Sequence, residues 1–122
     1  MSNHLYVVDD DPAIGRLSRM ILQSEGFKVE AFTSPLEAFA NLADRSLPDP
    51  AAIILDLNMP DMDGWEFYRR AREVGCDSPV LILSAFGAKA AKSELGADAA
   101  LAKPFEPDVL ASTVRGLVLK GE

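Results

Sequence analysis

The run Ala51-Ala52-Ile53-Ile54-Leu55-Asp56 establishes the architecture, because an unbroken apolar segment stops abruptly at a charge. Such a run is typical of a strand buried on both faces, as in a parallel sheet with helices on each side. Open sheets of this kind build their sites beyond the carboxyl ends of the strands. We therefore expect Asp56 to lie at the mouth of a sheet, within a functional site.

Similar apolar runs end at Asp9-Asp10, at Ser84 and at Lys103. If the strands are parallel, their ends converge, and one pocket holds three carboxylates, a hydroxyl and an ammonium group. The expected strands are Leu5–Val8, Lys28–Phe32, Ala51–Leu55, Val80–Leu83 and Ala99–Ala102.

Helical patterns alternate with these strands, which predicts an α/β fold with one doubly wound sheet and a single domain over residues 1–122. The expected helices are Pro12–Ser24, Pro35–Arg45, Gly64–Glu73, Ala88–Leu95 and Pro107–Leu119. Their expected N-caps are Asp11, Ser34 and Asp63. The apolar faces that we expect against the sheet comprise Ile14, Leu17 and Ile21 in the first helix and Leu110, Val114 and Leu117 in the last.

The net charge of -7 argues against direct nucleic-acid binding by this domain, since phosphate contacts need a basic surface. No apolar run is long enough to span a membrane, and the first residues lack the pattern of a signal peptide, so a cytoplasmic location is expected. Cys76 is the only cysteine, and we expect a solvated spectator thiol in a loop. His4 is likewise expected to be solvated.

The converging acids favour a bound cation. Two carboxylates about 5 Å apart repel each other by roughly 3 kcal/mol at an effective dielectric constant near 20. Three acids with only Lys103 nearby would also repel a dianionic phosphoryl donor, and a divalent ion reverses that repulsion. Other sites fit poorly, because the chain has no Gly-rich phosphate loop and no complete calcium loop. A haloacid-dehalogenase phosphatase would need a second aspartate where Asn58 stands.

The chain resembles the receiver domain of bacterial response regulators, the CheY-like family of two-component signalling. The resemblance covers essentially the whole chain and rests on Val7–Pro12, Ile54–Gly64, Ser84-Ala85 and Lys103-Pro104-Phe105. It implies a flavodoxin-like (βα)5 fold with five parallel strands in the order 2-1-3-4-5, which brings Asp9-Asp10 beside Asp56.

The resemblance implies a role for each residue of the pocket. Asp56 is the expected phosphoacceptor, and Ser84 and Lys103 are expected to hold phosphoryl oxygens. The Ala85 backbone N–H and Asn58 also belong to the expected phosphoryl-binding set, and a cis peptide bond before Pro104 would aim Lys103 inward. The expected ion is Mg²⁺, with Mn²⁺ as the alternative, and its expected ligands are Asp9, Asp10, Asp56 and the backbone carbonyl of Asn58.

The implied function is phosphorelay signal transduction. The domain would take a phosphoryl group from a sensor histidine kinase or histidine phosphotransfer protein and then change its contacts with a downstream protein. It is expected to be a phosphoprotein and regulator, not an enzyme, although it would assist its own phosphorylation and dephosphorylation. Docking is expected on the first helix and pocket loops, with Ile14, Gly15 and Pro104 as candidates. The alternative is a phosphorylation-independent interaction module.

Two departures from the family pattern bear on switching. The segment from Ser84 to Lys103 is about three residues shorter than usual, which predicts a shortened fourth helix. Ala100 stands where many receivers carry a mobile aromatic ring, so we expect movement to centre on the loop after Ser84 and the fourth helix. Phe86 has two open interpretations: its ring shields the phosphoryl group, or it packs on the loop itself.

Overall fold

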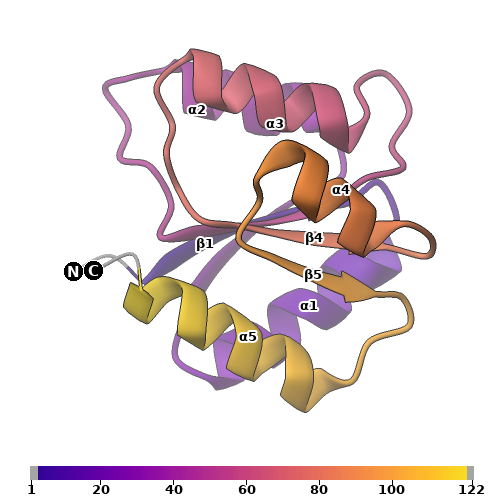
Figure 1. The fold of residues 1–122 in the computed structure, drawn as a ribbon. Helices are drawn as coiled ribbons and strands as arrows, with labels where there is room; N and C mark the ends of the chain where they lie inside the picture. The colour runs from indigo at the N-terminus through magenta and orange to yellow at the C-terminus, as the bar shows by residue number, and fades with distance from the viewer. Residues whose placement is uncertain (1–2, 121–122) are drawn as a thin grey trace.

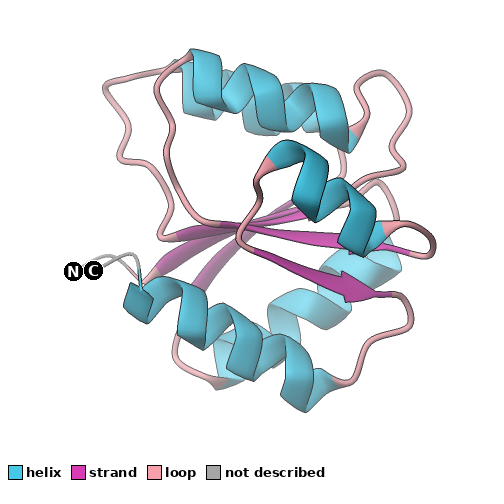
Figure 2. Cartoon of the chain, in the orientation of Figure 1, coloured by secondary structure: helices cyan, strands magenta, loops and turns pink. Residues whose placement is uncertain are grey.

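The computed structural model describes residues 3–120, which form alternating strands and helices (Figure 1, Figure 2). The strands are β1 (His4–Val8), β2 (Lys28–Phe32), β3 (Ala52–Asp56), β4 (Val80–Ser84) and β5 (Ala99–Ala102). The helices are α1 (Pro12–Ser24), α2 (Pro35–Ala43), α3 (Gly64–Glu73), α4 (Ala88–Leu95) and α5 (Pro107–Lys120).

The strands form one parallel sheet in the order β2-β1-β3-β4-β5, which confirms the predicted fold class and topology. The central strands β3 and β4 are buried along their whole length, while the edge strands β2 and β5 are partly exposed. This difference explains why the central strands read as continuous apolar runs. The carboxyl ends of β1 and β3 lie side by side, with Val8 paired to Leu55.

Helices cover both faces of the sheet, with α1 and α5 on one side and α2, α3 and α4 on the other (Figure 1). Two hydrophobic clusters correspond to these two sides. Leu110, Val114 and Leu117 of α5 are buried as predicted. In α1 the predicted face is only partly right: Ile21 packs against the core, but Leu17 is 43% exposed and the buried residues are Gly15, Ser18 and Leu22. Gly15 and Ser18 are small, so they let α1 lie close to the sheet. At this face, small side-chain size determined which residues are buried more than hydrophobicity did.

The predicted caps are confirmed. The carboxylates of Asp11 and Asp63 accept the N–H groups of Ala13 and Glu66, and the Ser34 hydroxyl accepts that of Glu37. The structure differs at the end of α2, which stops at Ala43 and not at Arg45. The cause is Asp44, whose carboxylate accepts the backbone N–H and hydroxyl of Ser46 and turns the chain.

The fourth helix has 8 residues and is the shortest of the described helices, as predicted. It buries only Ala88 and Ala91. Its N-cap is Gly87, in a left-handed conformation with a φ of 72°, and no side chain caps the helix there. Short length, small buried groups and the absence of a side-chain cap are features that favour local opening of a helix.

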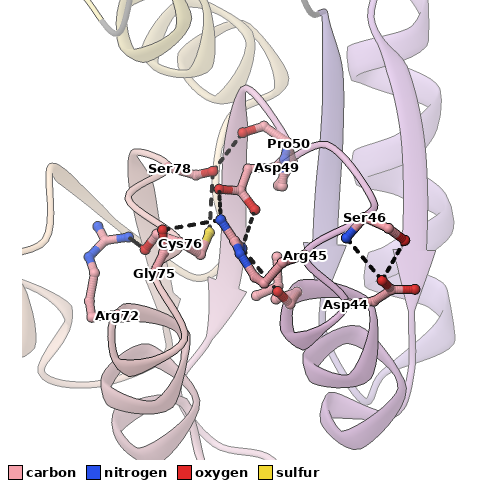
Figure 3. A network of polar contacts seen from close by, with 10 residues as sticks. Asp44, Arg45, Ser46, Asp49, Pro50, Arg72, Gly75, Cys76 and Ser78 are labelled. Atoms are coloured by element: carbon pink, nitrogen blue, oxygen red, sulfur yellow. Dashed lines mark hydrogen bonds and ion pairs between the residues drawn. The ribbon is translucent and has the colours of Figure 1, made fainter.

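A polar network ties two loops together at the amino ends of β3 and β4, opposite the mouth of the sheet (Figure 3). Arg45 donates to the Asp49 carboxylate through its two terminal guanidinium nitrogens, at 2.9 and 3.2 Å, and also to the Gly75 carbonyl. From α3, Arg72 donates to the Cys76 carbonyl at 2.8 Å. These bonds join the loop before β3 to the loop before β4, which fixes where both strands begin.

Two expectations of solvated side chains are wrong. Cys76 is fully buried, and its Sγ lies 3.4 Å from the Ser78 hydroxyl, because the tied loop folds the thiol inward against the core (Figure 3). His4 belongs to β1, where its Nε2 lies 2.7 Å from a carboxylate oxygen of Glu30 and its ring contacts Tyr6. Strand pairing places His4 beside β2, a neighbour that local sequence does not reveal.

No helix within residues 3–120 has the length and apolar character needed to cross a membrane.

Candidate functional site

Asp56 is the last residue of β3, at the carboxyl edge of the sheet. The strands on either side are β1 and β4, and Asp56 itself pairs with Leu83 of β4. Its side chain is buried at 3% exposure. The position agrees with the expectation that this acid stands at the mouth of a parallel sheet, where the strand order reverses.

Lys103 joins two of the acids. Its Nζ donates to Oδ2 of Asp9 at 2.8 Å and to Oδ1 of Asp56 at 3.1 Å. Lys103 follows β5, its backbone N–H donates to the Ser84 carbonyl, and the peptide bond to Pro104 is cis, as the resemblance implied. Residues almost a hundred positions apart therefore share one ion-pair network, and the predicted inward direction of Lys103 is confirmed.

Asp9, Asp10 and Asp56 form a cluster in which one carboxylate oxygen from each lies within 4.8 Å of the others. Asp9 is 1% exposed and accepts the Asp11 N–H at 2.9 Å, whereas Asp10 is the most accessible of the three. At such distances two carboxylates repel by about 3 kcal/mol at an effective dielectric constant near 20. One ammonium group does not balance three carboxylates, and hard oxygen ligands of this kind fit a divalent cation.

The pKa values of both Asp56 and Lys103 are raised in this pocket. Burial raises the pKa of Asp56, the charge of Asp9 adds to the increase, and Lys103 opposes it. For Lys103, burial acts to lower the pKa, but the hydrogen bonds and charges of Asp9 and Asp56 outweigh it and leave that pKa raised. The ammonium form is therefore favoured, and the crowded carboxylate Asp56 holds its charge less readily than a solvated one.

Ser84 ends β4, but its hydroxyl does not bond the acids. It donates to the Phe86 carbonyl at 2.6 Å and accepts the Phe86 N–H at 3.2 Å and the Asn58 side-chain amide at 3.4 Å. The alternative to a phosphoryl-binding role, a strand-end hydroxyl that bonds backbone groups, describes Ser84 in this conformation. A serine hydroxyl readily bonds a backbone group two residues on.

The loop after β4 is open to solvent. Ala85 is exposed, and the ring of Phe86 is 86% exposed, so neither interpretation of Phe86, as a shield or as a ring packed on its loop, describes this conformation. Ala100 lies half-buried on β5. A pocket of about 280 Å³ lies between this loop, α4 and β5, and the residues that line it are Ser84, Ala85, Gly87, Ala88, Lys89, Ala90, Ala100 and Ala102.

Gly64 is a positioning residue that sequence reasoning missed. A Cβ built on it would lie 2.6 Å from the Asp56 carbonyl oxygen and 2.7 Å from the Cα of Leu57. Its backbone N–H donates to the Leu57 carbonyl at 2.9 Å. The first turn of α3 therefore rests directly on the end of β3, and only glycine permits this approach. The glycine after the capping Asp63 was the available signal.

The candidate docking residues differ in accessibility. Pro104 is exposed and Ile14 is half-buried, but Gly15 lies on the buried face of α1 and offers little surface. Exposed side chains of α1 beside them include Arg16, Arg19 and Met20, the last at 68% exposure.

The Response regulator receiver domain family matches residues 5–115 of the chain. Among curated proteins, the response regulator MprA of Mycobacterium bovis is 38% identical over 122 residues, covering 97% of this chain and 51% of MprA. The chain thus spans about half the length of the curated relatives it matches.

Solved structures show the same fold. A CheY-like response regulator receiver domain protein from Methanospirillum hungatei superposes with a TM-score of 0.88, at 23% identity, over 99% of this chain and 97% of its own. The BeF3-activated receiver domain of DrrB from Thermotoga maritima superposes with a TM-score of 0.82, at 25% identity, over 98% of this chain and 99% of its own.

Proposed function

The chain belongs to the response regulator receiver domain family of two-component signalling, and on that premise we propose that Asp56 accepts a phosphoryl group and thereby switches protein contacts. The observation that carries this proposal is the Lys103 ammonium group, which bonds Asp9 and Asp56 at once at the mouth of the sheet. Such a pocket presents a carboxylate nucleophile beside a fixed positive charge.

In the proposed reaction, a carboxylate oxygen of Asp56 forms a bond to phosphorus as the P–N bond of a donor phosphohistidine breaks. The donor imidazole leaves with the electron pair of that bond, and Asp56 becomes an acyl phosphate. The burial of Asp56 at 3% exposure keeps water away from the nucleophile. Lys103 already lies 3.1 Å from the Asp56 oxygen, so its ammonium group is placed to hold an oxygen of the incoming group.

A divalent ion fits the acidic cluster. Carboxylate oxygens from Asp9, Asp10 and Asp56 within 4.8 Å of one another match the ligands that Mg²⁺ and Mn²⁺ prefer. The backbone carbonyl of Asn58 is the fourth proposed ligand. When bound, the ion would supply positive charge against a phosphoryl group. The Ala85 N–H, the Ser84 hydroxyl and Asn58 are proposed to hold the remaining phosphoryl oxygens.

The proposed donor is a sensor histidine kinase or histidine phosphotransfer protein. Its proposed docking surface is α1 with the loops around the pocket, where Ile14 and Pro104 present surface. We also propose that residues 1–122 make up one receiver domain that acts through a downstream protein, in the cytoplasm. Its role would be regulatory, with no substrate beyond its own phosphorylation and dephosphorylation.

Incubation with acetyl phosphate and Mg²⁺, followed by intact mass measurement, tests the proposal. The wild-type protein is expected to gain the mass of one phosphoryl group. Asp56→Asn is expected to gain nothing, and Asp77→Asn, at an exposed position at the other end of the sheet, should behave as wild type. Equal labelling of Asp56 in excess chelator would refute the role of the ion.

A phosphorylation-independent interaction module is the second candidate function. It is favoured by the Ser84 hydroxyl, which is fully occupied by Phe86 and Asn58 in this conformation. No mass gain in wild-type protein, from either acetyl phosphate or a phosphorylated donor, would support this second candidate over the first.

A further inference from the structure

The Ser84 hydroxyl has no bonding capacity left. A serine hydroxyl has one proton to donate and two lone pairs to accept with. The proton goes to the Phe86 carbonyl at 2.6 Å, and the lone pairs accept the Phe86 N–H at 3.2 Å and the Asn58 amide at 3.4 Å. A phosphoryl oxygen only accepts hydrogen bonds, so Ser84 can donate to it only by giving up the Phe86 carbonyl.

If Ser84 exchanged its hydrogen bond to the Phe86 carbonyl for one to a phosphoryl oxygen, Phe86 would be released. It sits between Ala85 and Gly87, outside any strand or helix, and its ring is 86% exposed. The bond from Ser84 holds its carbonyl. Gly87 has a φ of 72° and space around its Cα, so the backbone next to the ring can rotate more freely than other residues allow.

A place for the ring exists beside the loop. The pocket of about 280 Å³ is lined by residues on both sides of Phe86 and by the small side chains Ala88, Ala100 and Ala102. An apolar cavity of about 150 Å³ is enough to hold benzene, so the pocket has room for a phenyl ring. The walls come from the loop, from α4 and from β5, so a ring seated there would contact all three.

We propose that the two Ser84–Phe86 hydrogen bonds form a latch: when Ser84 turns to a phosphoryl group on Asp56, the Phe86 ring is released and moves from solvent into the alanine-lined pocket. This inference rests on the proposed phosphorylation of Asp56. The exchange couples chemistry at β3 to the position of α4, because the seated ring packs against Ala88 and Ala100. A ring exposed to water in the unmodified protein becomes buried, which favours the seated state once the latch opens.

The test uses the whole chain with ¹³C-labelled alanine methyl groups, and beryllofluoride with Mg²⁺ as the phosphoryl mimic. In the bound state, the Ala100 and Ala88 methyl resonances should shift upfield and show nuclear Overhauser contacts to the Phe86 ring. Relaxation of the ring protons by a soluble gadolinium chelate should fall at the same time. The ¹⁹F resonance of bound beryllofluoride reports occupancy of Asp56 separately.

Three variants separate the latch from other causes. Phe86→Leu should still bind beryllofluoride but lose the upfield methyl shifts. Phe39→Leu, which removes a half-buried ring from α2, should keep them. Ala100→Phe fills the pocket, so Phe86 should stay exposed when the mimic binds.

Bound mimic with an exposed Phe86 ring in the wild-type protein would overturn the latch and leave the phosphoacceptor proposal standing. Methyl shifts that persist in Phe86→Leu would also overturn it. If no beryllofluoride binds at all, the proposed function fails and the latch fails with it.

Discussion

Ser18 lies on the buried face of α1 at 0% exposure, and its hydroxyl has no hydrogen-bond partner among the described residues. A buried, unsatisfied hydroxyl costs stability, and an alanine of similar size removes that cost. We expect Ser18→Ala to raise the free energy of unfolding by about 1 kcal/mol, measured by urea denaturation.

Ser78 provides the matched control, because it is also buried but its hydroxyl donates to the Pro50 carbonyl at 2.6 Å (Figure 3). Ser78→Ala leaves that carbonyl unpaired and should lower the free energy of unfolding by about 1 kcal/mol. Changes of the same sign in both variants would contradict the assignment of Ser18 as unsatisfied.

Asp56 has a pKa raised above its ordinary value of 3.8, chiefly by burial. The folded state therefore binds the Asp56 proton more tightly than the unfolded state does, and this residue's contribution to stability falls as the pH rises from 3.8 through the folded pKa. An amide cannot ionise. Without added metal, Asp56→Asn should therefore be more stable than wild type at pH 7, and the difference should shrink as the pH falls toward 3.8.

Urea unfolding in chelator across this pH range measures the difference between the two proteins. An Asp56→Asn protein less stable than wild type at pH 7 would show that the Lys103 ion pair outweighs burial and the charge of Asp9.

At the scale of elements, the contact between α3 and β3 depends on the absent side chain of Gly64. An added Cβ would lie 2.6 and 2.7 Å from backbone atoms, which cannot move aside without shifting the end of β3. Gly64→Ala should therefore lower the free energy of unfolding by about 1–3 kcal/mol, as overpacking does. The same shift displaces Asp56, so the acetyl phosphate reaction should also slow.

Gly116 is the control for this substitution. It lies inside α5 with nothing within 4 Å of an added Cβ. Gly116→Ala should raise the free energy of unfolding by about 0.5–1 kcal/mol, because alanine has the higher helix propensity. If both alanines destabilise equally, close packing at Gly64 is not the cause.

At the scale of the whole molecule, the two ends of the sheet have different roles, one structural and one in the candidate site. The amino ends of β3 and β4 are tied by the network of Arg45 and Arg72, while the carboxyl ends gather the acids and Lys103. The net charge of -7 adds to the negative potential of the cluster. A divalent ion that binds only the folded chain should then stabilise the whole domain.

At a Mg²⁺ concentration of about 100 times its Kd, the free energy of unfolding should rise by about 2.7 kcal/mol relative to a sodium chloride solution of equal ionic strength. Asp10→Asn should lose most of this gain, whereas Asp77→Asn, an exposed acid outside the cluster, should keep it. An equal gain in all three proteins would mean that the ion acts elsewhere or by general screening.

The sequence by itself determined the order of elements, the parallel sheet and the acids and lysine that meet at its mouth, whereas the strand order came from the resemblance to receiver domains. This was possible because short stretches of sequence identify each element. Unbroken apolar runs mark the central strands, and the N-cap residues Asp11, Ser34 and Asp63 mark the starts of helices. Parallel strands then bring their carboxyl ends to one edge whatever the loops between them. Asp9, Asp56 and Lys103 were therefore predictable as neighbours.

Only the tertiary structure decided how side chains use that arrangement. The buried face of α1, the buried thiol of Cys76 and the pairing of His4 with Glu30 all depend on contacts between residues distant in sequence. The Ser84 hydroxyl could have pointed toward the acids or toward the backbone of the following loop. It points toward the loop because the carbonyl and N–H of Phe86 lie within hydrogen-bond distance. The physical reason is that periodicity follows from short-range backbone geometry, whereas packing and hydrogen-bond choice follow from which surfaces meet.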